Sequence, residues 1–155
     1  AWILQRAGCS DETLLAAALL HDVVEDCGLS LQALAEEFSP DVARLVDQLS
    51  ERKADADGRP RPWEVRKREH LEHLAHASPA VQALFLADKL HNLESIAFDL
   101  EAGDDVWARF NAPRERLMWY YRAVVDACTA DDPCVRTLVA ACRDVLAKLD
   151  ATQPG

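Results

Sequence analysis

Three times in this chain a short polar side chain stands directly before a proline, and these pairs are Ser39-Pro40, Ser78-Pro79 and Asp132-Pro133. Ser and Asp side chains cap the free N–H groups of a first helical turn, and proline is favoured at the first helical position. Each pair is followed by a run rich in leucine, valine and alanine. The pairs therefore predict the beginnings of three helices, the second of which extends to Gly103.

Apolar residues recur at helical spacing along most of the remaining chain. We predict further helices over residues 1–8, 11–26, 31–38, 63–77, 104–110 and 112–128. No run alternates as a strand would, and residues 51–62 combine two prolines with no apolar period, which predicts a loop. With 155 residues, half of them apolar, we expect a single all-α domain of about seven to nine helices over 1–150 and a tail at 151–155.

The formal net charge of −10 argues against general nucleic-acid binding, which needs a basic surface. No apolar run approaches the roughly 18–20 residues that span a membrane, and we recognise no signal peptide, so we expect a cytoplasmic protein. The five cysteines are odd in number and form no CxxC pair. They predict reduced thiols rather than a disulfide framework.

The basic residues are unevenly distributed along this acidic chain. Seven of the 17 lie between positions 51 and 68, namely Arg52, Lys53, Arg59, Arg61, Arg66, Lys67 and Arg68. Such a local positive cluster could serve a small anionic ligand. A solvated loop followed by an exposed helix face explains the same composition equally well.

The segment "HDVVED" places four titratable residues, His21, Asp22, Glu25 and Asp26, after the apolar run "LLAAALL". Residues four apart share a helix face, so His21 aligns with Glu25 and Asp22 with Asp26. A buried carboxylate carries a large desolvation penalty, which proteins avoid by pairing, protonation or metal coordination. A histidine alone would more often be a hydrogen-bonded core residue, but the adjacent acidic groups favour a functional site.

A second apolar run, "ALFLADKLHNLESI", is interrupted by Asp88, with His91 and Asn92 one turn further on. Asp88 could simply pair with Lys89 or with an arginine elsewhere. Because two apolar helices each offer an inward carboxylate, however, we expect a shared cation. One imidazole and two carboxylates suit Mn²⁺, Fe²⁺ or Zn²⁺ better than a thiolate-preferring metal. The histidines of "EHLEHLAH", His70, His73 and His76, are better explained as a solvated helix face.

The pair "HDVVED" and "ADKLHNL", about sixty residues apart, resembles the HD-domain metal-dependent phosphohydrolases. More narrowly, it is similar to the hydrolase domain of RelA/SpoT alarmone enzymes and to small alarmone hydrolases. The similarity extends more loosely through "WEVRKREHLEHL" and "WARFNAPRERLMWYY", and so covers most of the chain.

The resemblance implies a role for each matching residue. His21, Asp22 and Asp88 would be metal ligands, and Glu25 and Asp26 would orient and deprotonate the attacking water. The substrate-binding candidates that the resemblance implies are Asn92, Lys89, Arg116, Tyr120 and Lys67. Lys89 stands where many relatives carry Arg, which keeps the charge but loses the planar fork.

The activity implied is removal of the 3′-pyrophosphate of (p)ppGpp, giving GDP or GTP and pyrophosphate, with Mn²⁺ as cofactor. One alternative is a phosphatase acting on NADPH or a deoxynucleotide. The other is a non-catalytic helical domain that binds a nucleotide or a partner. A homo-oligomer is compatible with each alternative.

The resemblance also places the family's first metal-ligand His, and an N-terminal helix, ahead of the segment "AWILQRAG". We therefore expect that the chain as written lacks this His and supplies three of four protein ligands.

Overall fold

The computed structural model describes residues 1–51, 53–55 and 57–151, apart from the side chain of Glu25. Arg52 of the basic cluster and residues 152–155 of the predicted tail lie outside this range. The helices are α1 (Trp2–Arg6), α2 (Glu12–Leu20), α3 (Val23–Cys27), α4 (Leu31–Glu37), α5 (Pro40–Leu49), α6 (Trp63–Ala75), α7 (Pro79–Glu101), the 3-10 helix η1 (Val106–Arg109), α8 (Arg114–Ala127) and α9 (Pro133–Ala151). Within the described ranges, the one β feature is an isolated bridge between Ala54 and Pro60 in the predicted loop. The predicted all-α class and number of helices are confirmed.

The capping pairs begin helices as predicted. The Ser39 hydroxyl accepts a hydrogen bond from the Val42 N–H at 3.2 Å, at the start of α5. The Ser78 hydroxyl accepts one from the Val81 N–H at 3.5 Å, at the start of α7. At α9, the Asp132 carboxylate accepts from the N–H groups of both Cys134 and Val135. These local contacts satisfy donors that a helix start leaves without intrahelical partners.

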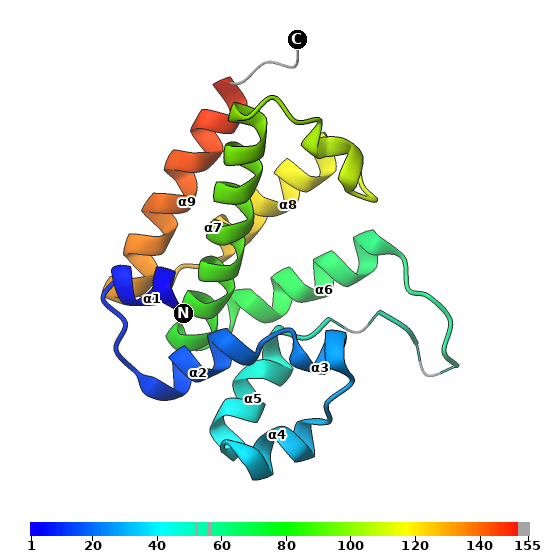
Figure 1. The fold of residues 1–155 in the computed structure, drawn as a ribbon, viewed down its shortest axis with the longest axis vertical. Helices are drawn as coiled ribbons and strands as arrows, with labels where there is room; N and C mark the ends of the chain where they lie inside the picture. Colours follow the sequence, from blue (N-terminus) through cyan, green and yellow to red (C-terminus); the bar gives the residue numbers. More distant parts are fainter. Residues whose placement is uncertain (52, 56, 152–155) are drawn as a thin grey trace.

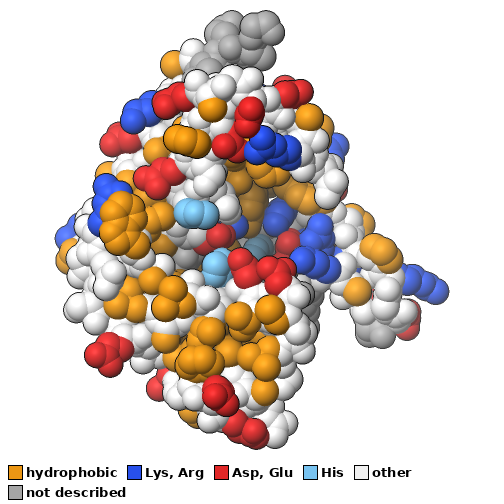
Figure 2. Space-filling view, in the orientation of Figure 1, with side chains coloured by type: hydrophobic (Ala, Val, Ile, Leu, Met, Phe, Trp, Pro, Cys, Tyr) orange, Lys and Arg blue, Asp and Glu red, His pale blue; other side chains and the backbone are white. Residues whose placement is uncertain are grey.

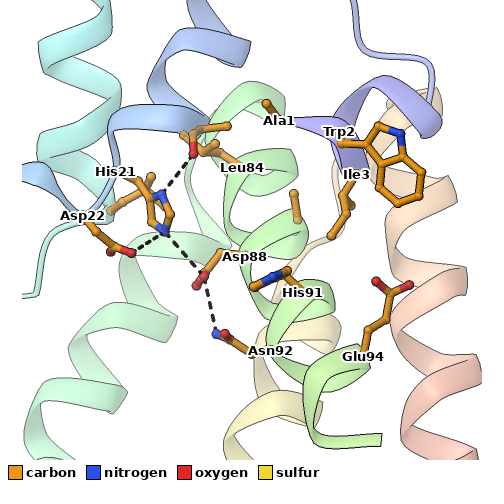
Figure 3. Close-up of a pocket in the computed structure, with 13 residues that line it drawn as sticks. Ala1, Trp2, Ile3, His21, Asp22, Leu84, Asp88, His91, Asn92 and Glu94 are labelled. Atoms are coloured by element: carbon orange, nitrogen blue, oxygen red, sulfur yellow. Dashed lines mark hydrogen bonds and ion pairs between the residues drawn. The ribbon is translucent and has the colours of Figure 1, made fainter. Parts of the chain in front are cut away.

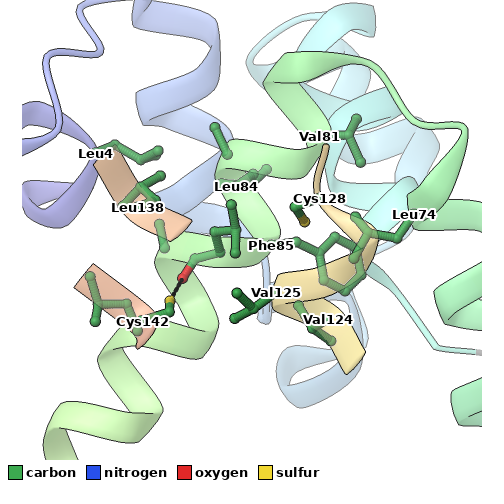
Figure 4. Close-up of a cluster of buried hydrophobic side chains, with 14 of the residues drawn as sticks. Leu4, Leu74, Val81, Leu84, Phe85, Val124, Val125, Cys128, Leu138 and Cys142 are labelled. Atoms are coloured by element: carbon green, nitrogen blue, oxygen red, sulfur yellow. Dashed lines mark hydrogen bonds between the residues drawn. The ribbon is translucent and has the colours of Figure 1, made fainter. Parts of the chain in front are cut away.

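Helix α7 lies at the centre of the fold (Figure 1) and packs against α1, α2, α5, α8, α9 and η1. Its side chains form the middle of the core shown in Figure 4, where Phe85 lies toward α8 and Leu84 faces α1 and α9. The apolar residues of the run around Asp88 are all buried, namely Leu84, Phe85, Leu86, Leu90 and Leu93. Asp88 lies between these residues in α7, so its carboxylate is on the side of the helix that faces the interior of the fold.

The predicted helix over 11–26 is divided in two, because α2 ends at Leu20 and α3 begins at Val23. The His21 ring nitrogen Nδ1 donates a hydrogen bond to the Ala18 carbonyl at 3.0 Å. In a continuous helix this carbonyl would accept from the backbone N–H of Asp22, so the side chain competes with the helical pattern. The predicted single helix was wrong at this point, and the break lies at the candidate ligands.

The expectation of reduced thiols was wrong for two of the cysteines. Cys9 and Cys134, which are 125 positions apart in sequence, form a disulfide with their Cα atoms 6.1 Å apart. Cys9 follows α1, and the packing of α1 beside α7 and α9 brings it to the first turn of α9. Sequence spacing does not reveal this proximity, since it arises only when the helices are packed. Three thiols are free, namely Cys27, Cys128 and Cys142.

Among the described residues, no helix is both long enough and apolar enough to span a bilayer.

Candidate active site

The break between α2 and α3 brings His21 and Asp22 next to Asp88 of α7 (Figure 3). The Nε2 atom of His21 lies 3.0 Å from Oδ2 of Asp22 and 3.7 Å from Oδ1 of Asp88. Asp88 is about three-quarters buried, His21 is 30% exposed and Asp22 is 64% exposed. The predicted meeting of these two helical segments therefore occurs, although Asp22 lies at the rim rather than inside.

The orientation of His21 is fixed by its second ring nitrogen. A carbonyl oxygen can only accept, so the contact with Ala18 places the proton on Nδ1. Nε2 is thereby directed between the two carboxylates, where it donates a hydrogen bond when the ring is protonated and offers a lone pair to a metal when the ring is neutral. A backbone carbonyl behind the ring is the usual support of a metal-binding histidine. The interaction with Asp88, assisted by the charge of Asp22, raises the pKa of His21 despite its partial burial.

Asp88 is the most interconnected group of the site. Its carboxylate accepts a hydrogen bond from the Lys89 ammonium at 2.6 Å and a longer one from the Asn92 amide at 3.4 Å. Burial opposes ionisation of Asp88, but its contacts with His21 and Lys89 outweigh this and hold its pKa well below the usual range. Asp88 is therefore an anion at neutral pH. The Asp88–Lys89 pair that the sequence left as an alternative is present beside the histidine contact.

The donor set is compatible with a divalent cation. Two ligand atoms that share one ion at 2.0–2.2 Å lie roughly 3 to 3.5 Å apart, and the two distances from His21 are 3.0 and 3.7 Å. In the described part of the chain, however, no three His, Cys, Asp or Glu side chains form a ready-made metal group.

Two cavities meet at this cluster, where Figure 2 shows a hollowed surface ringed by histidine, acidic and basic side chains. The larger, about 450 Å³, is also lined by Ala1 and Trp2 from the α1 end and by His91 and Asn92 of α7. Its volume lies within the range of ligand pockets. The smaller, about 220 Å³, shares His21, Asp22 and Asp88. Its other wall carries the three lysines Lys53, Lys67 and Lys89, with Glu51, His70 and Tyr120.

Two titratable side chains of the lysine-lined cavity, Lys67 and His70, are partly desolvated. Burial lowers the pKa of Lys67, whose ammonium lies 4.6 Å from the centre of the Tyr120 ring. The Tyr120 hydroxyl lies 3.4 Å from Nδ1 of His70, and burial lowers the pKa of His70 to about 4. His70 also packs edge-on against Phe85, with ring centres 4.5 Å apart. The solvated face predicted for the three histidines was therefore wrong for His70, whereas His73 and His76 are exposed.

The structure separates the remaining candidates. Tyr120 and Lys67 line the smaller cavity, whereas Arg116 is exposed, forms an ion pair with Glu64 and lines neither cavity. Asp26 is also exposed and lines neither cavity. The side chain of Glu25 lies outside what the structure describes.

His91 and Glu51 line these cavities, and neither received a role from the sequence. His91 was noted only for its distance of three residues from Asp88, which was the available signal. Glu51 looked like one acid in a basic loop, and nothing in its spacing reveals its contacts with Arg66 and Lys67.

Comparisons with known proteins agree on one family. Residues 1–116 match the family model described as HD domain. A mouse protein named guanosine-3′,5′-bis(diphosphate) 3′-pyrophosphohydrolase MESH1 is 37% identical over 94 residues, which are 61% of this chain and 49% of that protein. The chain thus spans about half the length of this curated relative.

Two solved structures share the fold. The structure of lmo0812 from Listeria monocytogenes has a TM-score of 0.82 and 27% identity, covering 97% of this chain and 95% of that one. A structure entitled "A metazoan ortholog of SpoT hydrolyzes ppGpp and plays a role in starvation responses" has a TM-score of 0.72 and 30% identity. It covers 93% of this chain and 73% of that one.

Proposed function

The chain belongs to the HD-domain family, and on that premise we propose that it hydrolyses the 3′-pyrophosphate of guanosine 3′,5′-bis(diphosphate) to give GDP and pyrophosphate. The observation that carries the proposal is the placement of His21, Asp22 and Asp88 where two cavities meet, one of them lined by three lysines. The larger cavity would hold the nucleoside, and the lysines would face the phosphates. The names of the mouse relative and of the metazoan structure support this choice of substrate.

HD-domain hydrolases are metal-dependent, and His21, Asp22 and Asp88 would hold the ion, for which we propose Mn²⁺ over Fe²⁺ or Zn²⁺. A divalent metal supplies an activated water and polarises a phosphoryl oxygen. Ala1 lines the larger cavity, so the predicted further His ligand ahead of it would approach the site from this side.

The chain's own groups would do the rest of the work. Lys89 and Lys67 neutralise phosphate charge, which develops further as the pyrophosphate leaves. Asn92 holds Asp88 and faces the nucleoside cavity. Asp26 and Glu25 stay predicted as the groups that position the water and take its proton. The cytoplasmic location and a homo-oligomeric state likewise stay predictions.

The test is the release of pyrophosphate from ppGpp by the purified protein with Mn²⁺, measured together with GDP by ion-exchange chromatography. Asp88→Asn should abolish release, while Asp150→Asn, which removes an exposed carboxylate of α9 that pairs with Arg122 of α8, should leave it unchanged. Loss of phosphate from NADPH or a deoxynucleotide, with ppGpp intact, would favour the superfamily phosphatase. A folded protein that binds no metal and alters no nucleotide would favour the non-catalytic alternative.

A further inference from the structure

Glu51 is a carboxylate in the wall of the lysine-lined cavity, whose other two acidic lining residues are the candidate metal ligands Asp22 and Asp88. It lies just beyond the end of α5 and lines the smaller cavity with Lys53, Lys67 and Lys89. Its side chain is only 14% exposed. A negative charge at this position opposes the binding of a phosphate, so its presence among three lysines needs an explanation.

The contacts of Glu51 join it to two cations at once. Its Oε2 atom accepts a hydrogen bond from the Lys67 ammonium at 3.1 Å and forms an ion pair with the Arg66 guanidinium at 2.9 Å. Arg66 is itself held in place, since its Nε donates to the Arg61 carbonyl at 3.2 Å. If Lys67 turned to another anion, Glu51 would keep Arg66 as a partner. The large cost of leaving a buried carboxylate without a counter-ion is thereby avoided.

Lys67 is suited to such an exchange. It is partly desolvated between Glu51 and the face of the Tyr120 ring, and its neighbour across the cavity is Lys89. A phosphate oxygen is a stronger ligand for an ammonium than an aromatic face is. A short movement of a flexible side chain would therefore transfer the ammonium from one anion to another.

We propose that Glu51 is a positioning residue that competes with the substrate's pyrophosphate for Lys67. The pyrophosphate takes over the Lys67 ammonium when the nucleotide binds, and Arg66 retains Glu51. After cleavage, Glu51 recovers Lys67 and so promotes the release of pyrophosphate. The inference rests on the proposed function for the identity of the anion, but its binding step is measurable without turnover.

The experiment is isothermal titration of inorganic pyrophosphate into the purified protein, with and without Mn²⁺. Glu51→Gln keeps the shape of the side chain and removes its charge, and it should bind pyrophosphate about tenfold more tightly than wild type. Glu51→Asp should stay near wild type, and Asp150→Asn serves as the control for removing a carboxylate from an ion pair. Lys67→Met should weaken binding, and the gain from Glu51→Gln should vanish in the double variant.

A merely structural Glu51 would give a different pattern. Its loss would destabilise Arg66 and Lys67, so circular dichroism melting temperature and pyrophosphate affinity would fall together. Unchanged or weaker binding in a folded Glu51→Gln protein overturns the inference, as does a gain that persists without Lys67. In turnover, Glu51→Gln should lower both the KM and the kcat, because product leaves more slowly.

The two proposals fail separately. Tighter pyrophosphate binding by Glu51→Gln in a protein that hydrolyses no ppGpp would contradict the proposed function and support the role of Glu51. Hydrolysis of ppGpp with no effect of Glu51→Gln on pyrophosphate affinity or the KM would support the proposed function and contradict the role of Glu51.

Discussion

Replacement of Asp88 by asparagine should remove the response of the protein to divalent metal. Asp88 is the buried member of the candidate ligand set, 3.7 Å from His21 Nε2, and it is held as an anion by Lys89. Asparagine has the same shape but no charge, so the packing of α7 is kept. Its neutral amide would replace an anionic oxygen ligand, which Mn²⁺ prefers.

The magnitude follows from binding linkage. Free metal at 1,000 times its Kd stabilises the folded state by about 4.1 kcal/mol, which for a chain of this length raises the Tm by roughly 8–16 °C. If Asp88→Asn weakens binding about 1,000-fold, the same metal concentration adds only about 0.4 kcal/mol. The Tm would then rise by roughly 1–2 °C.

The assay is calorimetric melting with and without Mn²⁺, and the quantity compared is the metal-induced change in Tm. Asp88→Asn also takes the ion-pair partner of Lys89 away, which can lower the Tm of the metal-free protein. Comparing the metal-induced change in Tm cancels this loss. Asp99→Asn is the matched control, since Asp99 lies on the same helix and pairs with Arg109 at 2.7 Å. If Asp88→Asn gained as much from Mn²⁺ as wild type and Asp99→Asn do, the metal site would not include Asp88.

Three further outcomes are expected. Burial lowers the pKa of His70 to about 4, whereas an unfolded histidine has a pKa of about 6.5. Between these two pH values the unfolded chain therefore binds one more proton than the folded chain. The free energy of unfolding should therefore fall as pH is lowered through this window, by at most about 3 kcal/mol, and the wild-type minus His70→Gln difference in chemical denaturation measures it. Cys134→Ser should lower the free energy of unfolding by about 3–5 kcal/mol, since the disulfide closes a long loop, while Cys27→Ser, at an exposed free thiol, should change it little. Phe85→Ala should cost about 3–5 kcal/mol in the same assay, because Phe85 is 2% exposed in the core, and a loss below about 1 kcal/mol would contradict its central place.

Local rules in the sequence predicted much of the fold. Ser39, Ser78 and Asp132 cap helices because capping depends on the next three residues only. The approach of His21 to Asp88 was also predictable, since two apolar helices that carry polar groups tend to bury them together. The apolar character of α7 was therefore the strongest signal for the site.

Other features depend on contacts that spacing does not encode. The helix break after Leu20 requires the His21 ring to bond to Ala18. Glu51 meets Lys67 across 16 positions of sequence. Arg116 and Tyr120 are one turn apart, yet Tyr120 is buried against α6 while Arg116 reaches out to Glu64. Each outcome depends on a side-chain contact that forms only in the folded chain.

The location of bound Mn²⁺ in a crystal tests the central claim most directly. Anomalous scattering recorded near the manganese edge should give one strong peak in contact with His21 Nε2 and with the carboxylates of Asp22 and Asp88. A fully loaded crystal with its manganese bound elsewhere, and none touching these three side chains, would contradict the account.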